Sequence, residues 1–136
     1  MSGADDFFDT NVVLYLLSAD PGKADRAEEL LAGGGTISVQ VLNEFVAVAV
    51  RKLRMPWADV REVIEQVRAV CRVEPMTVET HERALHIAER YGLSIYDALI
   101  VSAALLAGCK TLYSEDMQDG QLLDRQLTIR NPFAAP

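Results

Sequence analysis

Short apolar runs alternate along the chain with longer stretches in which apolar residues recur at helical spacing. The short runs predict strands at residues 7–8, 36–38, 72–74, 110–113 and 127–129. The periodic stretches predict helices at residues 11–17, 24–32, 39–53, 57–70, 78–91 and 95–107. Strands separated by helices are typical of an α/β domain with a mainly parallel sheet. Two consecutive helices across residues 39–70 indicate an insertion near one edge of that sheet.

Composition narrows the class of protein. Half of the 136 residues are hydrophobic and 24% are charged, which favours one domain over residues 1–136 and excludes a mostly disordered chain. Thirteen basic and twenty acidic residues give a net charge of −7. Such a surface argues against a protein that coats nucleic acid by charge alone, although not against an enzyme that meets phosphates through bound cations.

The ends of the chain and its cysteines bear on location. The first six residues are polar and acidic, unlike a secretory signal, and no apolar run reaches the ~20 residues that a membrane span needs. Cys71 and Cys109 are too few for a disulfide framework and are typical of buried thiols in a reducing compartment. We therefore expect a cytoplasmic protein that does not bind membranes.

Two acidic residues lie just after predicted strands. Asp9 directly follows the first strand, and Asp116 follows the strand that ends at Tyr113. In open α/β sheets, ligands bind at the carboxyl edge of the strands. Each residue also has a purely structural explanation. Asp9 can cap the next helix, and Asp116 can belong to a solvated turn.

Two further acidic residues lie in predicted helices. Glu44 falls about 40° from Val48 on the helical wheel, at the border of the apolar face, and no basic residue lies three or four positions away. A solvated Glu44 remains the alternative. Asp97 follows Ser94 by three positions and precedes an apolar run, which is the spacing of a capping box. Capping alone explains Asp97, but it is compatible with a second role at the sheet edge.

Parallel, adjacent strands would bring these four acids to one edge of the sheet. Two carboxylates 4 Å apart repel by ~1 kcal/mol in water and ~4 kcal/mol at an effective dielectric constant of 20. A fold that brings several carboxylates together is therefore expected to bind a cation that offsets their repulsion. Ligands that are all oxygen atoms favour Mg²⁺ or Mn²⁺, and no Cys or His belongs to the group.

The segments that carry these acids are FFDTN (7–11), VLNEF (41–45), YDALI (96–100) and TLYSED (111–116), and the chain closes with IRNPF (129–133). In order and spacing, over nearly the whole chain, they resemble the PIN-domain nucleases and, more narrowly, the VapC toxins of bacterial toxin–antitoxin pairs. The resemblance implies a three-layer α/β/α domain around a central, mainly parallel five-stranded sheet. It also implies a Mg²⁺-dependent endoribonuclease in which metal-activated water cleaves RNA.

The resemblance assigns roles to individual residues. The residues that match its catalytic and metal-binding positions are Asp9, Glu44, Asp97 and Asp116, with Ser114 at a position where the family has Ser or Thr to hold a metal ligand or water. Asp119 matches an acid found in only some members. Glu115 lies outside the pattern, and we expect it to be solvated.

The resemblance also implies partners: an RNA substrate, a small cognate antitoxin protein and a second copy of the chain in a homodimer. Arg51, Lys52 and Arg54 are candidates for attracting RNA, although basic residues at a helix C-terminus also have a purely electrostatic explanation. Two other functions stay open. One is a non-catalytic protein-interaction module on the same fold. The other is a phosphomonoesterase, which the Asn at position 11 disfavours because such enzymes pair the nucleophilic Asp with a second Asp two residues on.

Overall fold

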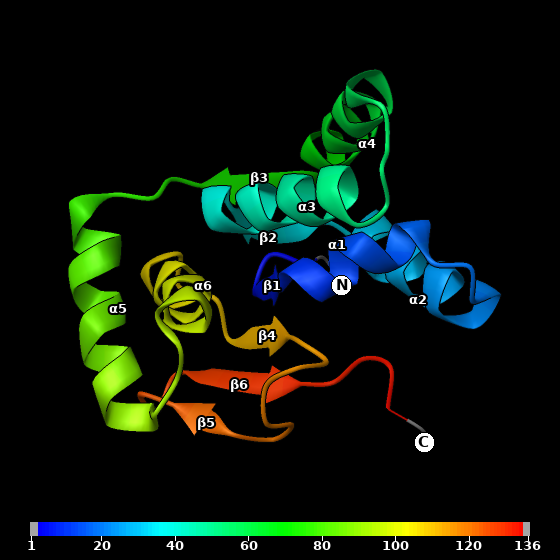
Figure 1. Cartoon of the computed structure of the whole chain (residues 1–136). Helices are drawn as coiled ribbons and strands as arrows, with labels where there is room; N and C mark the ends of the chain where they lie inside the picture. The colour runs from blue at the N-terminus through cyan, green and yellow to red at the C-terminus, as the bar shows by residue number, and fades with distance from the viewer. Residues whose placement is uncertain (1–2, 135–136) are drawn as a thin grey trace.

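A six-stranded sheet forms the centre of the computed structural model, which describes residues 3–134 (Figure 1). The strands are β1 (Asp6–Phe8), β2 (Gly35–Ser38), β3 (Cys71–Glu74), β4 (Thr111–Tyr113), β5 (Leu122–Leu123) and β6 (Leu127–Arg130). Their order is β3-β2-β1-β4-β6-β5, and every neighbouring pair is parallel except β5 with β6. The sheet is therefore mainly parallel, as predicted.

The sheet has one strand more than the five expected. The additional strand, β5, is two residues long and forms a hairpin with β6. In its turn, Gln126 N–H donates to the carbonyl of Leu123 at 3.0 Å, and Asp124 and Arg125 both have positive φ. This backbone matches the primed turns that join twisted strands. The turn lacks the Asn-Gly or Gly signal that would have revealed it in the sequence.

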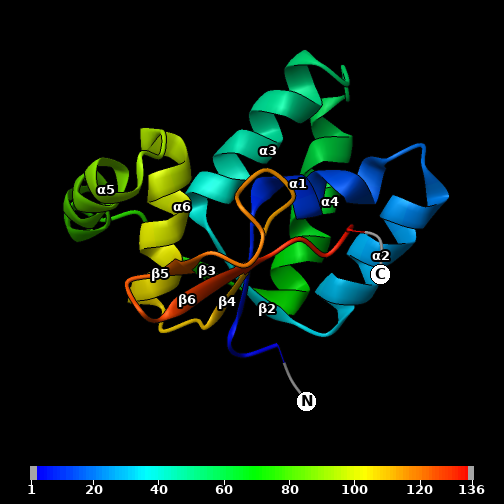
Figure 2. The same ribbon diagram turned by 90° about the horizontal axis from the view of Figure 1, so that it is seen from below.

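Helices cover both faces of the sheet. They are α1 (Thr10–Leu14), the 3₁₀ helix η1 (Tyr15–Leu17), α2 (Pro21–Ala32), α3 (Val39–Arg51), α4 (Trp57–Val70), α5 (Val78–Tyr91) and α6 (Ile95–Leu106). Figure 2 shows α5 and α6 on one side of the strands and α2 and α4 on the other, which makes three layers. As predicted, the α3–α4 hairpin is inserted next to an edge strand, β3. Within residues 3–134, every helix is too short or too polar to span a membrane.

The core lies between the sheet and its helices, and it fixes the carboxyl edge where the acidic residues were expected. Phe7 and Phe8 of β1 and Leu112 of β4 are fully buried. Helix α6 is apolar around its whole circumference and is buried from Ala98 to Leu105, because it lies between the sheet and α5. Its two ends reach the surface, and the first turn carries Asp97 there.

Candidate functional site

Asp9 lies at the junction of β1 and α1. Its backbone N–H donates to the carbonyl of Tyr113 at 2.9 Å, which ties the end of β1 to β4. Its Oδ1 accepts the N–H of Thr10 at 2.7 Å and so caps α1. The side chain is only 4% exposed. Asp9 therefore caps α1 and also lies at the carboxyl edge of the sheet. The sequence left these two explanations as alternatives.

Ser114 connects Asp9 to the loop after β4. Its fully buried hydroxyl donates to Asp9 Oδ2 at 2.7 Å. Ser114 Oγ also accepts hydrogen bonds from the backbone N–H groups of Asp116 and Met117, each at 3.2 Å. Ser114 thus orients one carboxylate and shapes the loop that carries another.

Asn11 lies between the same two carboxylates. Its Nδ2 donates to Asp116 Oδ2 at 3.1 Å and contacts Asp9 Oδ2 at 3.4 Å, and its Oδ1 accepts the N–H of Glu115 at 3.3 Å. In the sequence, Asn11 belongs to the segment FFDTN that carries the resemblance and argues against a phosphomonoesterase, but this role was missed. Its position two residues after a strand-end Asp, in the first turn of the next helix, was the available signal.

Glu44 is held on α3 by two neutral donors. Thr10 Oγ1 donates to Glu44 Oε1 at 2.7 Å, and Gln40 Nε2 donates to Oε2 at 2.9 Å. Glu44 is half-buried, so it is only partly solvated. Gln40 lies one helical turn before Glu44, and a search limited to basic partners overlooked it.

Asp97 lies in the first turn of α6, where the Ser94 hydroxyl accepts its backbone N–H at 3.1 Å. The expected capping interaction is therefore present. It uses the backbone N–H of Asp97 and not the carboxylate, so the carboxylate can have a second role. Burial raises the pKa of this carboxyl group above its usual value, and the negative charges of Glu44 and Asp116 raise it further. Asp97 therefore lies within electrostatic reach of both.

The strongest electrostatic perturbation is at Asp9. Burial raises the pKa of its carboxyl group to about 7, and repulsion from Asp97 and Glu44 adds to the effect. The hydrogen bonds from Ser114 and Thr10 act in the opposite direction, because they stabilise the carboxylate. The structure thus brings the four predicted acids into one electrostatic neighbourhood at the carboxyl edge of the sheet.

The chemistry of these residues fits a hard divalent cation, since they offer only oxygen ligands at high negative charge density. Nevertheless, no three acidic, His or Cys side chains in the described part of the chain form a group that could hold a metal ion as they stand. Asn11 lies between Asp9 and Asp116, and Thr10 holds Glu44 through its own hydrogen bond. An ion bound by these acids would therefore require some of these side chains to move.

Glu115 is half-buried in a small polar cluster, so the expectation that it would be solvated is wrong. It accepts hydrogen bonds from the hydroxyl of Tyr15 and from Lys23 Nζ, the latter at 3.2 Å. Lys23 also contacts the Tyr15 hydroxyl at 3.1 Å and lies 4.5 Å above the ring. The hydrogen bond to Glu115 raises the pKa of Tyr15. These partners come from η1 and α2, far from Glu115 in sequence, so no local pattern could reveal them.

The other charged residues singled out in the sequence lie outside the carboxylate group. Asp119 is exposed, and its Oδ1 accepts the N–H of Asn131 at 2.9 Å, so it fixes the closing segment of the chain. Arg51, at the end of α3, is about 10 Å along the helix axis from Glu44. Arg51 and its neighbours Lys52 and Arg54 are exposed there, at the tip of the α3–α4 hairpin.

Known proteins share this architecture. A family model described as PIN domain matches residues 7–118. The chain matches no curated protein sequence. It is similar to a toxin–antitoxin complex from Klebsiella pneumoniae, with 20% identity and a TM-score of 0.70 over 96% of this chain and 99% of that chain.

Two further solved structures are similar. VapC20 of Mycobacterium tuberculosis, a Sarcin-Ricin loop cleaving toxin, has 24% identity and a TM-score of 0.67 over 82% of this chain and 89% of that chain. VapBC2 of Rickettsia felis, bound to a DNA fragment from its promoter, has 18% identity and a TM-score of 0.66 over 93% and 98% of the two chains. At these identities, the likeness establishes a common fold.

Proposed function

The chain belongs to the PIN domain family, and from this premise we propose that it is a metal-dependent endoribonuclease that hydrolyses RNA phosphodiester bonds. One observation carries the proposal: a buried Asp9 whose pKa is raised to about 7 in the company of Asp97 and Glu44. In its ionised form such a group destabilises the fold, and a bound cation would offset this cost at pH values where no proton does. A perturbed carboxylate cluster at the edge of a parallel sheet is therefore best explained by function.

In this proposal, Asp9, Glu44, Asp97 and Asp116 hold Mg²⁺ or Mn²⁺. When bound, the ion lowers the pKa of a water molecule and neutralises an oxygen of the phosphodiester. The chain's own residues supply the orientation. Ser114 and Thr10 fix Asp9, Asn11 fixes Asp116, and Gln40 helps to fix Glu44. The oxygen of water attacks phosphorus and the 3′ oxygen leaves, so the products carry a 5′-phosphate and a 3′-hydroxyl.

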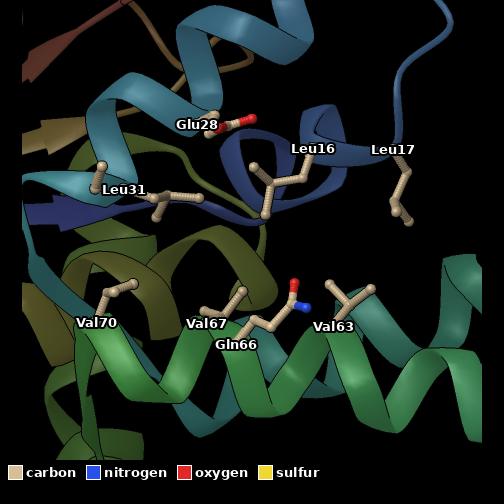
Figure 3. A pocket seen from close by; sticks show the side chains of 9 residues that line it. Leu16, Leu17, Glu28, Leu31, Val63, Gln66, Val67 and Val70 are labelled. Atoms are coloured by element: carbon tan, nitrogen blue, oxygen red, sulfur yellow. The ribbon is translucent and has the colours of Figure 1, made fainter.

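We further propose that the protein is the toxin of a toxin–antitoxin pair. In support, two similar solved structures are the toxin–antitoxin complex and VapBC2 described above. This chain also has a surface suited to a protein partner, an apolar groove of about 430 Å³ between η1 and α2 on one side and α4 on the other (Figure 3). Its apolar lining includes Leu16, Leu17, Leu31, Val63, Val67 and Val70. The homodimer implied by the resemblance stays a prediction.

The test is cleavage of total bacterial RNA and of short single-stranded RNA by the purified chain, in Mg²⁺ and in EDTA. We expect cleavage in Mg²⁺ only, 5′-phosphate products, and loss of cleavage in Asp9→Asn and Asp97→Asn. The matched control is Glu65→Gln, which removes an exposed acid on α4 and should cleave normally.

Three results would contradict the proposal. Cleavage that persists in EDTA would exclude metal dependence. Hydrolysis of a simple phosphomonoester without cleavage of RNA would favour the phosphomonoesterase. Failure to cleave any RNA, together with tight binding of a protein partner, would favour the non-catalytic module.

A further inference from the structure

A shallow groove opens beside the carboxylates, between α3 and the first turn of α6. Its volume is about 490 Å³, within the ~300–1,000 Å³ that small-molecule sites usually have. It is lined by Gln40, Asn43, Glu44, Ala47, Tyr96 and Asp97. Because Glu44 and Asp97 belong to the candidate site, whatever occupies the groove lies next to the reacting phosphate.

Tyr96 is the unusual residue of this groove. Its side chain is 62% exposed, although it stands at the start of α6, the most deeply buried helix of the fold. What the structure offers here is an accessible ring in the same groove as Glu44 and Asp97, with a face on which a planar group can stack. Asp97, its neighbour in the chain, is half-buried and lines the same groove as Tyr96 and Glu44.

The charge of the residues that line the groove determines which part of an RNA molecule can bind there. The lining contains two acidic residues, Glu44 and Asp97, and among residues 3–134 no Lys, Arg or His lines the groove. A phosphate would be repelled there, whereas an uncharged nucleobase would not. Asn43 is exposed on the α3 wall, and its side-chain amide offers both a donor and an acceptor to a base edge. Ala47 lies one helical turn further on, and its small side chain leaves the groove open.

We propose that this groove binds one unpaired nucleobase of the RNA next to the cleaved bond, with Tyr96 stacked on the base and Asn43 bonded to its edge. The inference rests on the proposed ribonuclease function and adds the residues that receive the base next to the cut. A base can stack on a protein ring only when it is free of its own duplex. The test therefore uses RNA that is single-stranded at the cut.

The experiment measures cleavage kinetics on a short RNA that the wild-type chain cuts. Stacking of one base on an aromatic side chain corresponds to about 5- to 150-fold in affinity. We therefore expect Tyr96→Ala to raise KM by a factor in this range with a smaller change in kcat, and Tyr96→Trp to restore the wild-type KM. Ala47→Leu should also raise KM, because it fills the groove with another good helix former and replaces no charged residue.

A base-free substrate makes the assignment specific. An RNA that lacks the base beside the cut should be cleaved by the wild-type chain at least as poorly as the intact RNA is by Tyr96→Ala, because the contact with Asn43 is lost as well. On this RNA, the wild type and Tyr96→Ala should be equally active. Trp57→Ala is the matched control, since Trp57 is a 56% exposed aromatic residue on α4 that does not line the groove. Its KM should equal that of the wild type.

The outcomes separate this inference from the proposed function. If the wild-type chain cleaves RNA in Mg²⁺ and Tyr96→Ala has an unchanged KM, the base-binding groove is overturned while the ribonuclease stands. The groove is likewise overturned if a continuous duplex is cleaved as fast as the single strand, or if Tyr96→Ala loses only the binding of a protein partner. If the wild-type chain cleaves no RNA, the ribonuclease itself is overturned.

Discussion

The buried carboxyl group of Asp9 makes the stability of the fold depend on pH. Its pKa is raised from 3.8 to about 7 in the folded chain, chiefly by burial. Between these two values the folded state binds a proton that the unfolded state has already released. The free energy of unfolding therefore falls as pH rises from about 4 to about 7, and this contribution is constant at higher pH.

We expect this loss to amount to about 4 kcal/mol in a metal-free sample, since each pKa unit corresponds to ~1.4 kcal/mol. Urea denaturation in EDTA at a series of pH values measures it. Asp9→Asn removes the titrating group, so the difference between the wild type and this variant isolates Asp9 from the other acids. Glu65→Gln, which replaces an exposed acid on α4, should keep the wild-type slope. Equal slopes in the wild type and Asp9→Asn would show that Asp9 has the same pKa in the folded and the unfolded chain.

At the scale of secondary-structure elements, most of the fold follows from local patterns. The apolar runs predict β1, β2, β3, β4 and β6, and helical spacing predicts every α-helix to within a few residues. The signals are local because each strand or helix buries its own apolar face. Strand β5 has no such signal. It is only two residues long and exists because it pairs with β6.

The candidate site was predictable to the extent that it depends on topology. Parallel strands bring residues at their carboxyl ends to one edge, so Asp9 and Asp116 could be placed together from the sequence. The residues that orient them could not be identified in this way. Asn11 and Gln40 act through amide groups that carry no charge or periodic pattern. The Lys23–Glu115 contact joins elements about ninety residues apart, and only the folded chain brings them together.

The link between the loop after β4 and the start of α1 depends on Ser114. Ser114→Ala removes a donor to Asp9 and leaves two backbone N–H groups without their acceptor. We expect a loss of about 1–3 kcal/mol in the free energy of unfolding and a clear loss of RNA cleavage. Ser102→Ala is a matched control, because Ser102 is also fully buried and donates to the Thr80 carbonyl at 2.8 Å, away from the carboxylates.

Both serine variants should lose stability in denaturant, but only Ser114→Ala should lose cleavage when assayed well below its melting temperature. The comparison separates a general cost of removing a buried hydroxyl from an effect on the site. Equal activity in the two variants would mean that the Ser114–Asp9 hydrogen bond serves the fold alone.

In the whole molecule, separate parts of the chain contribute the four carboxylates of the candidate site. Asp9 follows β1, Glu44 belongs to α3, Asp97 to α6 and Asp116 to the loop after β4. The chain as a whole carries a net charge of −7, so RNA must be attracted locally. Arg51 and its basic neighbours lie at the far tip of the α3–α4 hairpin. The bound cation is therefore the main positive charge that we expect at the cleavage site.

A cation shared by four elements should also stabilise the fold. Because it binds the assembled site and not the unfolded chain, Mg²⁺ at 100 times its Kd adds ~2.7 kcal/mol to the free energy of unfolding. For a domain of this size, that corresponds to a rise in Tm of roughly 8–10 °C. Differential scanning calorimetry in Mg²⁺ and in NaCl of equal ionic strength separates binding from simple screening of charge.

Asp9→Asn is the decisive variant for this prediction. It removes one ligand and one source of repulsion, so its Tm in EDTA at pH 7 or above should exceed that of the wild type, while its rise in Mg²⁺ should be smaller. Asp59→Asn, which changes an exposed acid in the first turn of α4, should show the full rise. A rise in Asp9→Asn as large as in the wild type would mean that Mg²⁺ stabilises the fold elsewhere, and that the acids at the carboxyl edge of the sheet do not share an ion.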